Sequence, residues 1–216
     1  MTQKSINVPF IKGLEKMSPA EFNAAMTRKA AADVIDSVNW PAEFPACPLT
    51  SFRIARSEAY IAVSFCVEGP DLLATEMGDN GHSWEDSCCE FFISPDGKEY
   101  FNFETTCIGS VLVERGTGRG DRAKLSRQEV AKVIRRSSLP HEPFELKGGN
   151  YVWKLDIMIP FELLGLDGAK LPESARANLY KCGDKTATPH YVSWSPIEIP
   201  NPDFHRPDFF GTLIFK

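Results

Sequence analysis

The sequence contains few cysteines, and none of them has the spacing that a cysteine-based site needs. Six cysteines in 216 residues are too few for a fold that depends on disulfide bonds. No Cys-x-x-Cys pair is present, so the sequence predicts no structural zinc site. We expect the cysteines to be buried free thiols, because free cysteine behaves as a small hydrophobic residue.

Long apolar runs and an excess of basic residues are also missing. No apolar run approaches the roughly 20 residues of a membrane-spanning helix, so the sequence predicts no membrane span. The N-terminal segment has no apolar core of signal-peptide length, which leaves two locations open: inside the cell, or outside it after removal of a leader. The formal net charge is -5 at pH 7, and a negative field disfavours nucleic acid and anionic membranes as partners.

What the sequence does contain is typical of a folded domain with many turns. Hydrophobic residues make up 43% and charged residues 25% of the chain, the ordinary range for globular domains. Sixteen prolines and fifteen glycines supply turn positions between short elements. No internal repeat or linker is evident, so we expect a single domain over residues 1–216, with its oligomeric state left open.

Two helices are predicted from their first residues. Ser18 and Glu21 have the spacing of a capping box, with proline at the first helical position between them. This pattern predicts an N-terminal helical segment over about residues 18–38. The same spacing recurs at Ser126 and predicts a second short helix over residues 126–136.

Most of the remaining chain shows the period-two alternation of β-strands. The alternation is clearest in Tyr60–Glu68 and Tyr151–Ile159. Further candidate strands are Ala177–Lys181, His190–Trp194 and Gly211–Phe215. Strands separated by Gly, Pro, Asn and Asp turns favour an antiparallel β-sandwich over βαβ units. The sequence therefore predicts a mainly β fold, an antiparallel β-sandwich with a few short helices, in which Pro196–Pro207 is a loop of the kind that often carries binding groups.

The most informative segment is a hairpin that runs from Trp84 to Glu104. Two apolar-rich runs flank Ser-Pro-Asp-Gly-Lys, in which proline presets the first turn position and Gly97 can adopt the left-handed conformation. This turn chemistry predicts a three-residue loop, Pro95–Gly97, that pairs Ser94 with Lys98.

The predicted turn sets the register of the hairpin and the two faces of its strands. In this register Glu90 lies opposite Asn102, and Phe92 lies opposite Tyr100. The core face holds Cys89, Phe91, Ile93, Phe101 and Phe103, and the other face holds Glu90, Phe92, Tyr100, Asn102 and Glu104. A slip by one residue would mix these faces, so the hydrophobic pattern disfavours it.

A strand face that combines carboxylates, an amide and aromatic rings suits a carbohydrate. Glu and Asn can bind paired hydroxyls, and flat rings pack against the apolar faces of sugars. Two alternatives remain open at this point. The face can be an ordinary solvated sheet face, or the carboxylates Asp86, Glu90 and Glu104 can be the acid pair of a glycoside hydrolase.

Three segments of the chain resemble a known family. They are Trp84–Phe92, Tyr100–Glu104 and the closing Phe210–Phe215. They resemble carbohydrate-binding module family 9 and its DOMON-like relatives, over roughly residues 34–216. The chain is most similar to a subgroup that also carries the motifs Asn178–Asp184, Pro189–Tyr191 and Pro202–Pro207.

The resemblance implies a jelly-roll or DOMON-like sandwich without catalytic residues, which holds a terminal mono- or oligosaccharide between two aromatic rings. By matching position, Trp84 would be one ring wall, with Glu90 and Asn102 as hydroxyl binders. Tyr100 and Glu104 complete the expected carbohydrate-binding face. The candidates for the second wall are Trp194, Phe204 and His205. Well-studied relatives carry an arginine two residues before the asparagine, where this chain has Tyr100.

The resemblance also bears on partners and cofactors. Family members usually sit beside a glycoside hydrolase domain, which implies an association with carbohydrate catabolism. Some relatives bind structural calcium, but no Asp/Asn cluster here has calcium-loop spacing. The candidate metal ligands Cys182, Asp184, His190 and His205 match no known ligand spacing, so we expect no metal or other cofactor. A DOMON-like sensor or scaffold that binds a protein partner through the same face is the alternative from another functional class.

Overall fold

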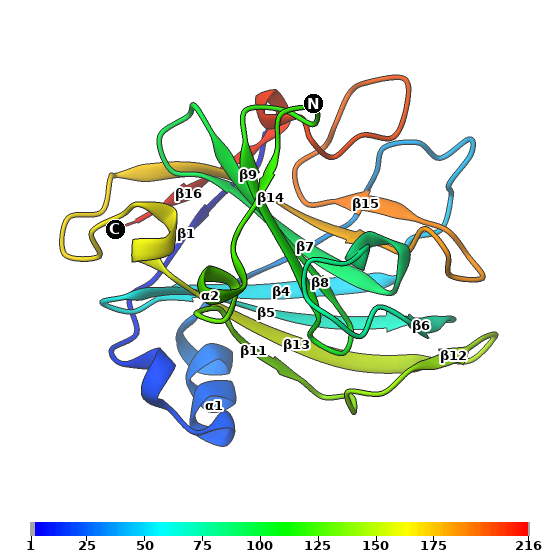
Figure 1. The fold of residues 1–216 in the computed structure, drawn as a ribbon, viewed down its shortest axis with the longest axis horizontal. Coiled ribbons are helices and arrows are strands. Elements are labelled where there is room, and N and C mark those ends of the chain that lie inside the picture. Colours follow the sequence, from blue (N-terminus) through cyan, green and yellow to red (C-terminus); the bar gives the residue numbers. More distant parts are fainter. Residues whose placement is uncertain (1–2, 216) are drawn as a thin grey trace.

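Strands from distant parts of the chain pair into two large β-sheets, and these sheets pack face to face (Figure 1). The structure is a computed structural model and describes residues 3–215. Within these residues, the larger sheet has nine strands, in the order β1-β16-β14-β7-β8-β9-β10, with β15 beside β14 and β3 beside β15. Its strands are β1 (Ser5–Asn7), β3 (Ser37–Val38), β7 (Cys88–Ser94), β8 (Tyr100–Thr106), β9 (Val111–Gly116), β10 (Ala123–Lys124), β14 (Ser174–Cys182), β15 (Tyr191–Ser193) and β16 (Gly211–Ile214).

The facing sheet has five described strands, in the order β11-β13-β5-β4-β2. They are β2 (Ala31–Val34), β4 (Leu49–Arg56), β5 (Tyr60–Gly69), β11 (Ile134–Ser137) and β13 (Tyr151–Pro160). A small third sheet pairs β6 (Leu72–Ala74) with β12 (Phe144–Leu146). Neighbouring strands are antiparallel within these sheets, except that β1 runs parallel to β16. The prediction of a mainly β, antiparallel sandwich is confirmed.

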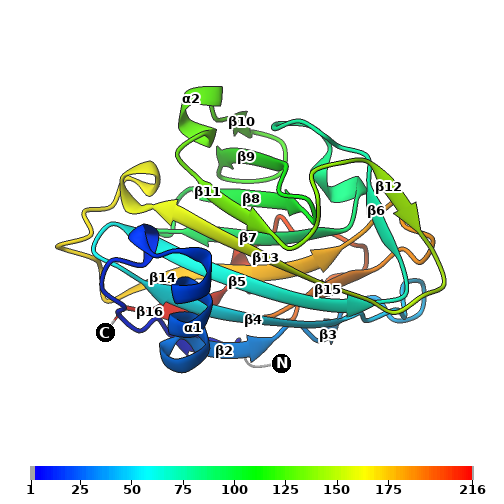
Figure 2. The ribbon, with the colours of Figure 1, turned by 90° about the horizontal axis from the view of Figure 1, so that it is seen from below.

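Short helices lie at the ends and on the outer surface of the sandwich. They are α1 (Pro19–Lys29), α2 (Arg127–Val130) and the 3-10 turns η1 (Leu14–Lys16), η2 (Ser83–Glu85), η3 (Phe161–Leu164) and η4 (Pro207–Phe209). Figure 2 shows α1 over the five-stranded sheet, on the side away from the larger sheet. Its buried Phe22 and Met26 contact Ala55, Ala62 and Met158 of that sheet. None of the helices described between residues 3 and 215 has the length and hydrophobicity needed to cross a membrane.

Both predicted helices begin where the capping boxes place them, and both end early. Ser18 Oγ accepts a hydrogen bond from the Glu21 amide, as the motif requires. The first helix stops at Lys29 rather than near residue 38, because the next residues pair as β2 with β4. The second helix stops at Val130, because residues 134–137 form β11 against β13. In both places, strand pairing overrides the local helical preference.

The hairpin of β7 and β8 has the predicted faces but not the predicted register. Glu90 pairs with Glu104, and Phe92 pairs with Asn102, so the pairing of Glu90 with Asn102 is wrong by two residues. The loop spans Pro95–Glu99 instead of three residues, because Ser94 Oγ donates a 2.6 Å hydrogen bond to the Glu99 carbonyl and so closes a wider turn. A shift of two residues leaves every side chain on its original face.

The outer face of the larger sheet is covered rather than solvated. Its side chains Glu90, Phe92, Tyr100, Asn102 and Glu104 are at most 4% exposed. Part of the cover is the proline-dense loop, whose Ile197 and Phe204 join a hydrophobic cluster with Phe92 and Tyr100. The alternative of an ordinary solvated sheet face is therefore wrong.

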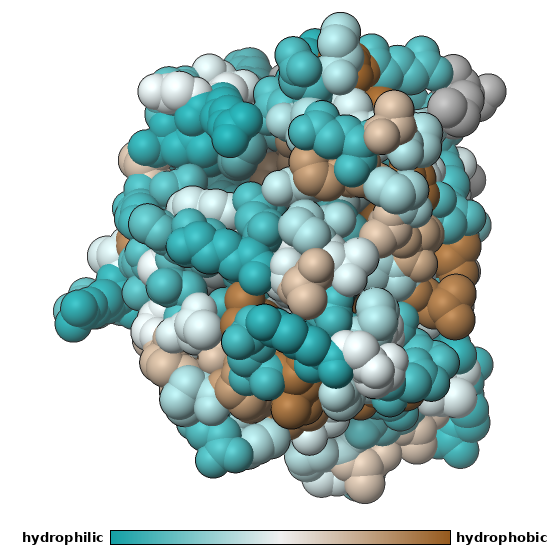
Figure 3. Space-filling model, turned by 90° about the vertical axis from the view of Figure 1, so that its right-hand side faces the viewer, coloured by the Kyte–Doolittle hydropathy of each residue, from teal (hydrophilic) through white to brown (hydrophobic). Residues whose placement is uncertain are grey.

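The end of the sandwich that carries β6, β12 and β15 has a mixed surface. Figure 3 shows that most residues on this end are hydrophilic and that hydrophobic residues lie in small patches among them. Scattered apolar residues of this kind are normal on a folded protein. The residues described on this end therefore form no large apolar surface for a protein partner.

Candidate functional site

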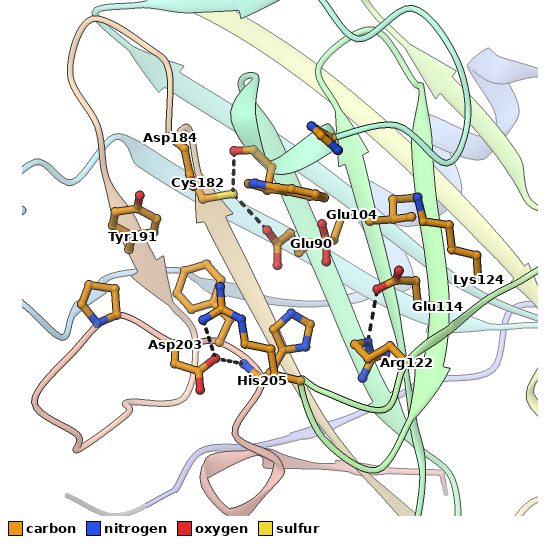
Figure 4. Close-up of a pocket in the computed structure, with 16 residues that line it drawn as sticks. Glu90, Glu104, Glu114, Arg122, Lys124, Cys182, Asp184, Tyr191, Asp203 and His205 are labelled. Atoms are coloured by element: carbon orange, nitrogen blue, oxygen red, sulfur yellow. Dashed lines mark hydrogen bonds and ion pairs between the residues drawn. The ribbon is translucent and has the colours of Figure 1, made fainter.

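A cavity of about 320 Å³ opens on the outer face of the larger sheet (Figure 4). Its floor comes from β7, β8, β9 and the end of β14, and its walls come from loops near residues 82–84, 119–124, 184–191 and 202–205. Figure 4 shows Glu90 and Glu104 on the floor, between the side that carries Cys182 and Asp184 and the side that carries Glu114 and Arg122. Strand pairing thus gathers groups that are far apart in the sequence.

The floor is built around two buried carboxyl groups, Glu90 and Glu104, which are direct cross-strand partners. Glu104 Oε1 accepts a 2.8 Å hydrogen bond from Asn102 Nδ2. Its Oε2 is buried without a hydrogen-bond partner among residues 3–215. Glu90 Oε1 accepts a 3.0 Å hydrogen bond from Cys182 Sγ. Glu104 Oε2 is therefore a free acceptor at the cavity floor.

Burial changes the protonation of both carboxyl groups. It raises the pKa of Glu104 from 4.5 to about 7, with Asn102 acting in the opposite direction. Burial, together with the nearby Cys182 and Glu104, raises the pKa of Glu90 well above its ordinary value. A protonated carboxyl group can both donate and accept hydrogen bonds. The pair can therefore bind a ligand hydroxyl in either direction.

The raised pKa of Glu104 predicts a specific dependence of stability on pH. The folded state holds this proton more tightly than the unfolded chain, so the group's contribution is fully present below about pH 4.5 and is lost as the pH rises through about 7. The free energy of unfolding, measured by urea denaturation, should fall more between about pH 5 and about pH 8 in the wild type than in Glu104→Gln. Equal pH dependence in the two proteins would refute the assignment.

Asn102 and Tyr100 lie beneath the cavity lining and hold an arginine in place. Both are fully buried. Arg122, from the loop between β9 and β10, donates to Asn102 Oδ1, and its guanidinium lies 4.3 Å from the Tyr100 ring centroid. It also forms an ion pair with Glu114 at 3.3 Å. Arg122 thus brings a guanidinium to Tyr100 and Asn102 from the connection between β9 and β10.

Trp84 lies at one side of the cavity, in the turn η2, and is half-buried. Its ring lies 4.8 Å from the ring of His82. The Trp84 carbonyl accepts a 3.2 Å hydrogen bond from the Asp184 amide, which ties this turn to the loop after β14. The ring therefore stands on a tethered backbone.

Two of the three candidates for a second ring also line the cavity. Phe204 stacks on Tyr180, with ring centroids 4.1 Å apart. His205 Nδ1 lies 2.9 Å from the Tyr100 hydroxyl. Burial, with Arg122 and Arg119 nearby, lowers the pKa of His205 to about 3, so the imidazole is neutral at ordinary pH.

The third candidate, Trp194, lies elsewhere. It is fully buried in the core between the sheets, and its Nε1 donates a 2.8 Å hydrogen bond to Asp33 Oδ2. Its backbone amide donates to the Leu179 carbonyl, and this continuation of the β14–β15 pairing directs the side chain inward. Trp194 therefore does not line the cavity.

Several cavity residues were not among the predicted site residues. Tyr191, Asp184 and Asp203 line it. Each of them stands in one of the three motifs that carry the resemblance to a subgroup of the family. Glu114, Arg122 and Lys124 also line it, but they flank a glycine-rich turn in which no sequence pattern marks them. Only the pairing of β8, β9 and β10 brings them to the cavity.

The candidate metal ligands that were chosen from the sequence do not come together. His190 Nε2 lies 2.8 Å from Lys181 Nζ, and His205 bonds to Tyr100. Within the part of the chain that the structure describes, one other group brings metal-ligating atoms close together, and it consists of Cys88, Glu90 and Cys182.

A family model and several solved structures that match this chain all describe carbohydrate-binding proteins. The family model of carbohydrate-binding family 9 matches residues 20–215. A solved structure from Bacteroides uniformis, of a protein with a suspected carbohydrate-binding role, is 36% identical, with a TM-score of 0.91 and 100% of both chains covered. No curated protein is significantly similar to the chain.

Two further structures share the fold at low identity. They are carbohydrate-binding modules of family 9 from Caldicellulosiruptor kristjanssonii, one in complex with cellotriose and one with glucose. Each is 11% identical, with TM-scores of 0.58 and 0.55; the match covers 99% of this chain in both and 94% and 96% of the module chains. Because the family model matches nearly the whole chain and the Bacteroides chain is similar over its full length, this chain belongs to carbohydrate-binding family 9.

Proposed function

We propose that this chain binds the terminal units of a carbohydrate in the cavity on the larger sheet, without catalysing its hydrolysis. The observation that carries the proposal is the combination of Glu90, the free Oε2 of Glu104 and the ring of Trp84 in one cavity. Buried carboxyl groups select hydroxyls, and the ring packs against the apolar face of a sugar. Family membership supports the same function.

The size of the cavity favours a short ligand. About 320 Å³ is at the lower end of the range of small-molecule pockets, which suits one or two sugar units rather than a long chain. Other charged groups that line the cavity, such as Glu114 and Lys124, can bind further hydroxyls or water. A short sugar offers few atoms for contact, so we expect modest affinity.

The carboxyl pair supports binding better than hydrolysis. Glycoside hydrolases place two carboxyl groups on either side of the scissile bond, and one of them must be ionised while the other is protonated. Glu90 and Glu104 are neighbours on one floor, and burial raises the pKa of both. Because the two groups lie side by side, they can hold a hydroxyl from one side, but they do not flank a bond between two sugar units.

A glycan array probed with the purified chain tests the proposal. The expected result is binding to a restricted set of saccharide termini, followed by saturable binding of the free sugar in calorimetry. Glucose and cellotriose are the first soluble probes, because the Caldicellulosiruptor modules were solved with them. An array without any hit, at protein concentrations that detect millimolar affinity, would contradict the proposal and favour a protein partner instead.

The same samples can be followed for hydrolysis. We expect each bound saccharide to be recovered intact after prolonged incubation. Release of shorter sugars by the wild type, but not by Glu104→Gln, would show that the carboxyl pair is catalytic.

A further inference from the structure

Three side chains that can bind a metal ion meet at the cavity floor, at the junction of β7 and β14. Cys88 and Glu90 are two positions apart on β7, so they share a face, and Cys182 is the direct cross-strand partner of Cys88. One ligand atom from each of the three residues lies within 4.8 Å of the other two. Figure 4 shows Cys182 directed at Glu90, and their Sγ and Oε1 atoms are 3.0 Å apart.

The cluster has no positive charge of its own. Among residues 3–215, no Lys, Arg or His side chain forms an ion pair or hydrogen bond with the side chains of these three residues. All three are buried. The three ligand atoms are therefore held close together without a cationic side chain bonded to them in the described chain.

A second observation at the same place points to a ligand. Glu104 is 4% exposed, pairs directly with Glu90 and lines the cavity with Glu90 and Cys182. Its Oε2 is buried without a hydrogen-bond partner in the described chain. An oxygen acceptor beside the cluster can hold a water or hydroxyl group bound to a metal ion.

We propose that Cys88, Glu90 and Cys182 bind a zinc-class divalent cation, with its remaining coordination position open toward the cavity and Glu104. Two thiolates and one carboxylate are ligands that zinc accepts, and three protein ligands with one open position are typical of zinc sites that bind a further group. Binding forms two metal–sulfur bonds and one metal–oxygen bond. It releases two thiol protons and one carboxyl proton to solvent, and leaves the group with a net charge of -1.

The route to the site is the cavity itself. Glu90 and Cys182 both line the cavity, and Cys88 lies beside Cys182 as its partner across the pairing of β7 and β14. The inference does not depend on sugar binding, although Glu90 and Glu104 belong to both sites. Metal binding can therefore be measured without any saccharide, and sugar binding can be measured in the presence of a chelator.

The test uses the full chain, reduced with a phosphine and freed of metal by a chelator that is then removed. Calorimetric titration with Zn²⁺ alone should show one equivalent bound, with an affinity that rises with pH because protons are released. Titration with Co²⁺ should give the thiolate charge-transfer band and the intense visible spectrum of a four-coordinate ion. Cys88→Ser and Cys182→Ser should each lower the Zn²⁺ affinity by at least about 10-fold, since loss of even an outer-shell group costs 10–100-fold.

Matched controls separate this site from the remaining thiols. Cys89→Ser changes the neighbouring residue, whose side chain lies in the core on the other face of β7. Cys47→Ser removes the exposed thiol. Both should keep the one-to-one Zn²⁺ binding of the wild type.

Three results would overturn the proposal. They are absence of stoichiometric Zn²⁺ binding by the reduced wild type, retention of full affinity in both Cys88→Ser and Cys182→Ser, and a Co²⁺ spectrum without thiolate bands. The spectrum is measured on the wild type, so it decides the question even if a serine variant fails to fold. Sugar binding that persists in chelator while Zn²⁺ binding fails would leave the proposed function standing.

Discussion

Replacing Trp194 with alanine is expected to lower the free energy of unfolding by about 3–5 kcal/mol, the range for large aromatic residues in protein cores. Trp194 is fully buried, its ring lies edge-on to Phe52 at 5.8 Å, and its Nε1 bonds to Asp33. A Cβ built at Gly211 would lie 2.6 Å from the Trp194 ring, so the ring also fills the space beside a strand backbone. Urea denaturation of wild type and variant measures the difference.

Trp194→Phe is the matched control for this variant. It keeps an aromatic ring in the core but loses the hydrogen bond to Asp33, so the expected loss of stability is smaller than in the alanine variant. In either variant, the fraction that remains folded should bind sugar with wild-type affinity, because Trp194 does not line the cavity. A stable alanine variant with weakened sugar binding would place Trp194 in the binding site after all.

Replacing Trp84 with alanine should give the opposite pattern. Sugar affinity should fall by about 1–3 kcal/mol, roughly 5- to 150-fold, because the ring supplies flat apolar contact to the ligand. Stability should change little, since Trp84 is only half-buried and stands in a short turn at the cavity edge. Calorimetry with the sugar identified on the array, together with urea denaturation, measures both quantities.

Trp84→Phe separates the ring from the rest of the side chain. It retains a flat apolar face, so its affinity should lie between those of the wild type and the alanine variant. Unchanged affinity in Trp84→Ala, for a sugar that the wild type binds, would remove Trp84 from the site. Together, the two positions distinguish a tryptophan that stabilises the fold, Trp194, from a tryptophan that contributes to sugar affinity, Trp84.

The sequence was sufficient to predict which residues of the hairpin share a face. Period-two alternation places Phe91 and Phe103 toward the core, and Glu90 and Glu104 on the opposite side, and the structure has the same arrangement. The register itself was not predictable from the turn residues. The Ser94 hydroxyl bonds within the loop and widens the turn, which moves Asn102 away from Glu90 and brings Glu104 opposite it.

In the candidate site, too, some residues could be predicted from the sequence and others could not. Trp84, Phe204 and His205 line the cavity, and each stands within one of the sequence motifs that carry the resemblance. Arg122 reaches Asn102 from a different strand connection, across a turn that carries no distinctive pattern. Long-range pairing, rather than local composition, decides which charged loop residue enters a site, because many surface loops carry arginine.

The sequence by itself determined the strand faces, the starts of the two helices and the mainly β class, because alternation and capping act over a few residues. Only the tertiary structure decided where the helices end, how the hairpin strands are paired and which side chains line the cavity. It also decided that Cys88 and Cys182, which are 94 residues apart, lie directly opposite each other with Glu90 beside them. Such contacts depend on the order of strands in the sheet, and sheet order is set by the packing of the whole chain.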